Sequence, residues 1–146
     1  MIINYKNLSI KDALSEYFRI LNTAQPVPSK RLAKSEIQTL VEFLLLPEKF
    51  ENKRFGSLAK TKVLEALADQ GTKITRANLN NKIYSILEKG YLRRDIDSVI
   101  YPMNFVQNGL QGIRRAVDTQ TNFDITFRFS NEYDNQGSKP DLQNNR

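Results

Sequence analysis

Residues 74–101, ITRANLNNKIYSILEKGYLRRDIDSVIY, carry the clearest structural signals in this chain of 146 residues. Thr75 is a helix-capping residue type, and Gly90 is a typical residue just past a helix end. Between them, apolar residues recur at the spacing of one buried helical face: Leu79, Ile83, Ile86 and Leu87. We therefore expect a helix over residues 76–89.

Two short strands are expected directly after this helix. Residues 92–95 and 99–101 hold apolar and basic residues on either side of Asp97 and Ser98, which favour a tight turn. Pro102 should end the second strand because proline lacks the N–H that a ladder needs. The pattern predicts a β-hairpin.

Two further helices are expected upstream. One runs over about residues 36–46 and ends at Pro47, and the other runs over residues 58–69 with Ser57 as its cap. Gly71 is well placed as a left-handed residue, which leaves only a short turn before the helix at residues 76–89. Two aromatic residues in the loop between the upstream helices are expected to fill the core: Phe50 and Phe55.

The flanking segments are predicted to add a helix at each end of this unit. Ser9 and Asp12 form an approximate capping box for a first helix that ends near Asn22, before the connector TAQPVPSK. A last helix, FVQNGLQGIRRAV, contains Gly109 and Gly112, so we expect it to be short or bent.

A strand is expected near the C-terminus, in the sequence NFDITFRF. Its apolar residues alternate with polar ones, so that one face is apolar: Phe123, Ile125, Phe127 and Phe129. This strand either closes the domain's own sheet, which we favour, or adds to the sheet edge of a neighbouring molecule. The chain thus divides into an N-terminal helix and connector (1–34), a central unit (35–102), a C-terminal helix and strand (103–129) and a polar tail (130–146).

The charge of the chain is basic and unevenly distributed. The net charge is +6 and the pI is about 9.6, a balance that favours polyanionic partners such as nucleic acid. Most of the excess falls between residues 52 and 94. The acids there are Glu65, Asp69 and Glu88, and the basic residues are Lys53, Arg54, Lys60, Lys62, Lys73, Arg76, Lys82, Lys89, Arg93 and Arg94.

Several function classes are disfavoured by what the sequence lacks. With no cysteine and no histidine, it can form neither disulfides nor zinc sites built from those residues, and it has no histidine base. We therefore expect no enzyme activity, no cofactor and no metal. No apolar run is long enough to span a membrane, and MIINYKNLSIKD lacks the order of a secretion signal. A soluble cytoplasmic protein without a membrane partner is expected.

The sequence LEKGYLRR, from Leu87 to Arg94, resembles the end of the recognition helix and the start of the wing in the MarR-type winged helix family. The resemblance covers about residues 35–101. It implies a mainly α fold with a small β-wing, a winged helix-turn-helix with an N-terminal helix and a C-terminal strand added. The flanking helices and the wing are shorter than is usual in that family, so dimerisation and ligand sensing are not carried over.

This resemblance and the charge together predict binding to duplex DNA. Asn pairs bidentately with adenine, and Arg or Lys with guanine, in the major groove. The predicted base-reading residues lie on the helix face away from the apolar stripe: Arg76, Asn78, Asn81, Lys82 and Ser85. The predicted contacts to the DNA backbone are Lys53, Arg54, Lys60, Arg93 and Arg94.

The expected role is transcriptional or replication regulation through double-stranded DNA. The alternative is a structural or docking subunit of a homo-oligomer or larger assembly, such as a phage virion, because a fold does not fix a function. The amino-acid usage is typical of an AT-rich genome, and the size suits a phage or mobile element. In this alternative the partner would dock on the strand residues Phe123, Ile125, Phe127 and Phe129, and the protein would reside in the host cytoplasm or the virion.

Overall fold

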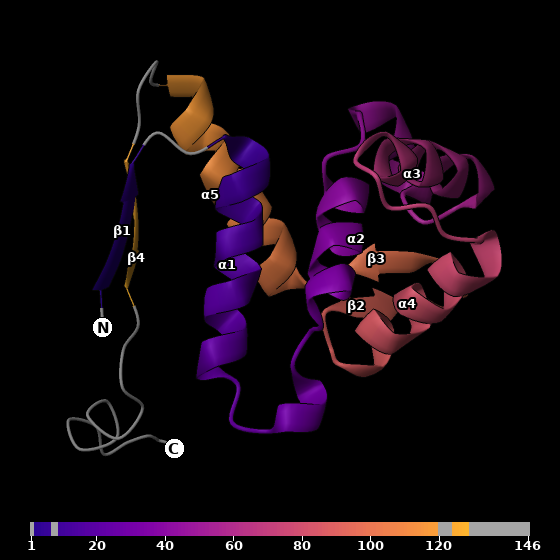
Figure 1. Ribbon diagram of the computed structural model, residues 1–146, viewed down its shortest axis with the longest axis horizontal. Coiled ribbons are helices and arrows are strands. Elements are labelled where there is room, and N and C mark those ends of the chain that lie inside the picture. The colour runs from indigo at the N-terminus through magenta and orange to yellow at the C-terminus, as the bar shows by residue number, and fades with distance from the viewer. Residues whose placement is uncertain (1, 7–8, 120–123, 129–146) are drawn as a thin grey trace.

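The computed structural model describes residues 2–6, 9–119 and 124–128, and it is mainly helical, with two small antiparallel sheets (Figure 1). The helices are α1 (Ile10–Ala24), α2 (Lys34–Leu44), α3 (Ser57–Asp69), α4 (Arg76–Glu88) and α5 (Asn104–Thr119). Two 3₁₀ helices, η1 (Pro28–Lys30) and η2 (Glu48–Lys53), lie in the connections on either side of α2. The strands are β1 (Ile2–Lys6), β2 (Leu92–Arg94), β3 (Ile100–Pro102) and β4 (Asp124–Arg128).

Helix α2 forms the centre of the core. It packs against α1, α3 and α4, and even its polar residues Glu36, Thr39 and Glu42 are buried. A helix whose polar side is also buried must be covered by other elements around its whole circumference. The core around it also takes in the predicted Phe50 and Phe55, both buried. The expectation that these two aromatic residues fill the core is confirmed.

The predicted helix signals are largely confirmed. The Oγ of Ser9 accepts a hydrogen bond from the N–H of Asp12 at 3.1 Å, and the Oγ1 of Thr75 accepts one from the N–H of Asn78 at 3.1 Å. Gly71 and Gly90 have φ angles of 87° and 90°, which favour glycine because it has no Cβ. Ser57, however, is the first residue of α3 rather than its cap.

Helix α5 is not shortened by its glycines, although the sequence predicted a helix that is short or bent. It runs unbroken over 16 residues. Gly109 lies against Tyr17 of α1 so closely that a Cβ built on it would be 2.5 Å from the ring carbon Cε2. The hydroxyl of Tyr17 donates a hydrogen bond to the carbonyl of Phe105 at 3.1 Å. The glycine therefore allows α1 and α5 to approach, and this packing compensates for its low helix propensity.

The β1–β4 sheet lies at one end of the molecule, whereas the β2–β3 sheet lies beside α4 in the other half (Figure 1). Strands β2 and β3 form the predicted hairpin, with Arg93 paired to Tyr101. Strand β4 lies within the predicted C-terminal strand, but it pairs with β1, which the sequence did not indicate. The register pairs Ile3 with Phe127 and Tyr5 with Ile125. Of the predicted docking residues, Phe123 and Phe129 lie outside the described residues.

Candidate nucleic-acid interface

One face of α4 is buried and the other is open to solvent. Leu79, Ile83 and Ile86 lie in the core, as their spacing predicts. The exposed residues of the helix are Arg76, Ala77, Asn78, Asn81, Tyr84 and Glu88. The structure thus presents a polar helix face to a partner, flanked by the hairpin β2–β3 and by the first residues of α2 and α3.

Asn78 and Asn81 occupy this open face, where the sequence placed them. Both side chains are exposed, one turn of helix apart. The hydrogen bond from Asn78 to Thr75 uses the backbone N–H of Asn78 and not its side-chain amide, which stays available. An exposed asparagine near the start of a helix can accept a hydrogen bond from the N6 amino group of adenine and donate one to its N7 in the major groove.

Arg76 is exposed but already holds α4 against α3. One of its guanidinium nitrogens donates to the carbonyl of Ser57 at 3.2 Å, and the other bonds the hydroxyl of Thr61. To reach a base, this side chain would have to give up both contacts. The geometry therefore favours a role in positioning α4 on the first turn of α3 over base reading.

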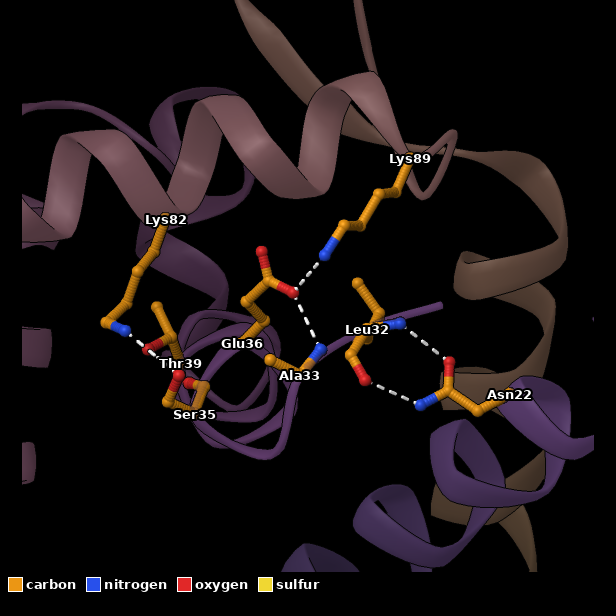
Figure 2. Close-up of polar contacts among 8 residues, drawn as sticks. All are labelled: Asn22, Leu32, Ala33, Ser35, Glu36, Thr39, Lys82 and Lys89. Carbon is orange, nitrogen blue, oxygen red and sulfur yellow. Dashed lines mark hydrogen bonds and ion pairs between the residues drawn. The ribbon is translucent and has the colours of Figure 1, made fainter. Parts of the chain in front are cut away.

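Lys82 and Ser85 turn toward the beginning of α2 rather than outward. The ammonium of Lys82 donates to the Oγ of Ser35 at 3.0 Å, as Figure 2 shows. Ser85 faces the carboxylate of Glu36 and helps to lower its pKa. Both residues line an open groove of about 400 Å³ between α4 and α2, which Asn78 and Asn81 also border. The polar groups of Lys82 and Ser85, which the sequence predicted to read bases, are thus directed at α2.

Glu36 is the centre of this contact between helices (Figure 2). Its Oε1 accepts hydrogen bonds from the N–H of Ala33 at 2.7 Å and from the ammonium of Lys89 at 2.6 Å. Burial by itself raises the pKa of Glu36, but the hydrogen bonds from Lys89, Ser85 and Ala33 outweigh it, so the pKa is lowered. The carboxylate thereby caps α2 and fixes the C-terminal end of α4 against it.

A second clamp holds the chain that leads into α2. The side chain of Asn22, at the end of α1, donates to the carbonyl of Leu32 at 2.7 Å and accepts from its N–H at 2.8 Å (Figure 2). This pair of bonds fixes the entry to α2 relative to α1. The open face of α4 therefore rests on a rigid support, which is what a recognition surface requires.

The hairpin presents two stacked arginines beside α4. The guanidinium of Arg93 lies 5.2 Å from the ring centre of Tyr101, and that of Arg94 lies 5.5 Å from the ring centre of Tyr84. Neither arginine is in an ion pair within the described part of the chain. Their charges thus stay available to an anionic partner.

The turn of the hairpin is rigid. The carboxylate of Asp95 accepts from the N–H groups of Asp97 and Val99, each at 2.9 Å, and Ser98 has a φ of 63°. This turn leaves Ile96 98% exposed at the tip. Because Asp95 and Asp97 lie at this turn, a phosphate would bind less favourably there than beside the arginines of β2.

Arg54 requires a correction. The sequence placed it among the phosphate contacts, but it is only 6% exposed. One guanidinium nitrogen donates to the carbonyls of Phe43, Leu44 and Leu46 at 3.2–3.3 Å. The C-terminal end of a helix carries partial negative charge, which favours a cation there. Arg54 caps α2 and cannot contact DNA.

The other two predicted backbone residues lie on the surface. Lys53 is exposed and Lys60 is half-buried, and both line a groove of about 350 Å³ together with Arg94. Tyr84 and Asn80 line the same groove, and neither was among the predicted site residues. The sequence could have indicated Tyr84 as a site residue, because its position lies outside the apolar stripe of α4 and places an aromatic ring on the open face. Asn80 gives no such signal in the sequence.

No family model, curated protein or solved structure matches this chain. Across the described residues, no helix is both long and apolar enough to cross a membrane. The same part of the chain holds no group of three or more Asp and Glu residues arranged to bind a metal ion.

Proposed function

We propose that this protein binds double-stranded DNA, with α4 as a recognition helix and the hairpin β2–β3 as the wing of a winged helix-turn-helix. The order α2, α3, a short turn, α4 and a hairpin is the order of that module. Regulation of transcription or replication is the role that such binding would serve.

The observation that carries this proposal is the open face of α4. Asn78 and Asn81 expose their amides there, and Arg93, Arg94, Lys53 and Lys60 flank the helix without ion pairs in the described residues. Polar amides at the centre with cations around them fit bases at the centre of a site and phosphates on its edges.

Titration of the full chain with random duplex DNA at two salt concentrations tests the proposal. Each phosphate neutralised releases counterions, so affinity should fall steeply between about 50 and about 200 mM salt. Undetectable binding at the lower salt concentration would exclude it.

Two substitutions then separate base reading from backbone contact. Asn81→Ala should change the preferred sequence, by about 1–3 kcal/mol at one base pair, while Asn108→Ala on the exposed side of α5 should not. Arg94→Gln should weaken all sequences alike and reduce the salt dependence by about one counterion. A uniform loss with both interface variants would contradict the assignment of roles.

A structural or docking role is the second candidate, and the β1–β4 ribbon favours it. Each of these strands has only one partner among the described residues, so the ribbon leaves edges at which a strand of another molecule could pair. If this role were the main one, DNA affinity would be absent, and deleting the ribbon would abolish oligomerisation while the helical unit stayed folded. Sedimentation of both forms would separate the two functions.

A further inference from the structure

Three cations from three different elements line one groove beside α4. Lys53 comes from η2, Lys60 from the first turn of α3, and Arg94 from β2. Residues far apart in sequence are thus gathered at one place by the fold. We call this the phosphate groove, defined by Lys53, Lys60, Asn80, Tyr84 and Arg94.

The groove has no acidic counterpart. None of the residues that line it is Asp or Glu, and none of its cations is in an ion pair within the described residues. In the adjoining hairpin turn, the carboxylate of Asp95 already accepts hydrogen bonds from two backbone N–H groups. Cations gathered without acids repel one another, and an anion seated among them would remove that repulsion.

A further feature of the groove suits an oxyanion. Gly56, which precedes α3, lines the groove and offers no capping side chain to the first turn of that helix, whose N–H groups and dipole favour negative charge. The Oδ1 of Asn80, a residue that also lines the groove, is buried without a hydrogen-bond partner. As an acceptor, this oxygen would pair with a donor elsewhere on a ligand and not with the charged oxygens of its phosphate.

Tyr84 gives Arg94 its position in the groove. The guanidinium lies over the ring of Tyr84, a residue that is 47% exposed, and such stacking restricts an otherwise flexible side chain. A guanidinium held in place loses less entropy when it binds an oxyanion bidentately. Tyr84 is in this sense a positioning residue for Arg94.

We propose that the phosphate groove is a binding site for one phosphate group. The proposal rests on the DNA-binding function only for the source of that phosphate: a phosphodiester of the duplex backbone, or a free phosphomonoester such as a mononucleotide. The chemistry of recognition is the same in both cases.

The first test uses isotope-labelled full-length protein titrated with sodium phosphate, and with sodium chloride at matched ionic strength, followed by NMR. Phosphate should cause saturable shifts of the backbone amides of Gly56, Lys60 and Arg94, and chloride should not. Lys60→Gln should weaken this binding about three- to tenfold, whereas Lys62→Gln, which lies outside the groove on the same helix, should leave it unchanged. No saturable shift up to about 50 mM phosphate would overturn the proposal.

The role of Tyr84 has its own readout. Tyr84→Phe should preserve phosphate affinity because the ring remains, and Tyr84→Ala should weaken it while the spectrum outside the groove stays unchanged. Equal affinity for both variants would contradict the positioning role. The amide signals elsewhere in α4 report whether either variant disturbs the fold.

Competition identifies the source of the phosphate. If duplex DNA displaces phosphate from the groove, and a methylphosphonate at one backbone position removes the effect of Lys60→Gln on DNA affinity, the ligand is the DNA backbone. If deoxyadenosine monophosphate shifts the same amides but duplex DNA binds nowhere, the phosphate site stands and the DNA function fails. If DNA binds, phosphate gives no shifts, and Lys60→Gln leaves DNA affinity unchanged, the phosphate groove is refuted while DNA binding stands.

Discussion

Replacing Gly109 with alanine should destabilise the protein, whereas the same change at Gly112, three residues further along α5, should stabilise it. Alanine is favoured over glycine in a helix by about 1 kcal/mol. Gly112 is exposed and has nothing within 4 Å of a built Cβ, so it should gain that amount. The two sites share a helix and a substitution and differ in their surroundings.

At Gly109 the gain in propensity is outweighed by a clash. A Cβ there would lie 2.5 Å from Cε2 and 2.6 Å from Cζ of Tyr17, so the ring must move. Moving it breaks the hydrogen bond to Phe105, worth about 1 kcal/mol, and disturbs the edge-to-face contact with Phe18. Overpacking typically costs about 1–3 kcal/mol. The net expected loss is about 1–3 kcal/mol.

Urea denaturation followed by circular dichroism measures both changes. A Tyr17→Ala background supplies the control, because without the ring Gly109→Ala should become stabilising, as Gly112→Ala is. This double-mutant cycle isolates the contact between α1 and α5. If Gly109→Ala and Gly112→Ala stabilised the protein equally, the close approach of the two helices would be refuted.

Three other predictions concern buried groups and the ribbon. Arg54→Met should lower the free energy of unfolding by about 2–4 kcal/mol while leaving the DNA affinity of the folded protein unchanged. A loss of DNA affinity at unchanged stability would instead show that Arg54 contacts the DNA backbone. Because the folded pKa of Glu36 is lowered, its contribution is complete above its ordinary pKa of 4.5 and is lost as pH falls through the folded value. Glu36→Gln should therefore flatten the fall in stability between about pH 5 and about pH 3, as urea titrations at each pH would show. A chain ended after Thr119 keeps every residue of the described core and should retain its helical circular dichroism, and a collapse of that signal would show that the β1–β4 pairing is essential.

The sequence alone determined the helices and the hairpin because their signals are local. Thr75 caps the helix that follows it, and the left-handed glycines Gly71 and Gly90 end helices, whatever the rest of the chain does. The apolar spacing of α4 likewise determined which of its faces is buried, and with it the exposure of Asn78 and Asn81. Such features depend on residues within a turn or two of each other.

Only the tertiary structure decided which polar residues remain free on the surface. By residue type, three residues were plausible DNA contacts: Arg54, Lys82 and Ser85. In the fold, Arg54 contacts the end of α2, whereas Lys82 and Ser85 face its beginning. Whether Gly109 can be replaced by a larger residue likewise depends on Tyr17, which is distant in sequence. A buried cation or carboxylate is tolerable only where partners converge on it, and that convergence is set by packing between helices and cannot be read from neighbours in sequence.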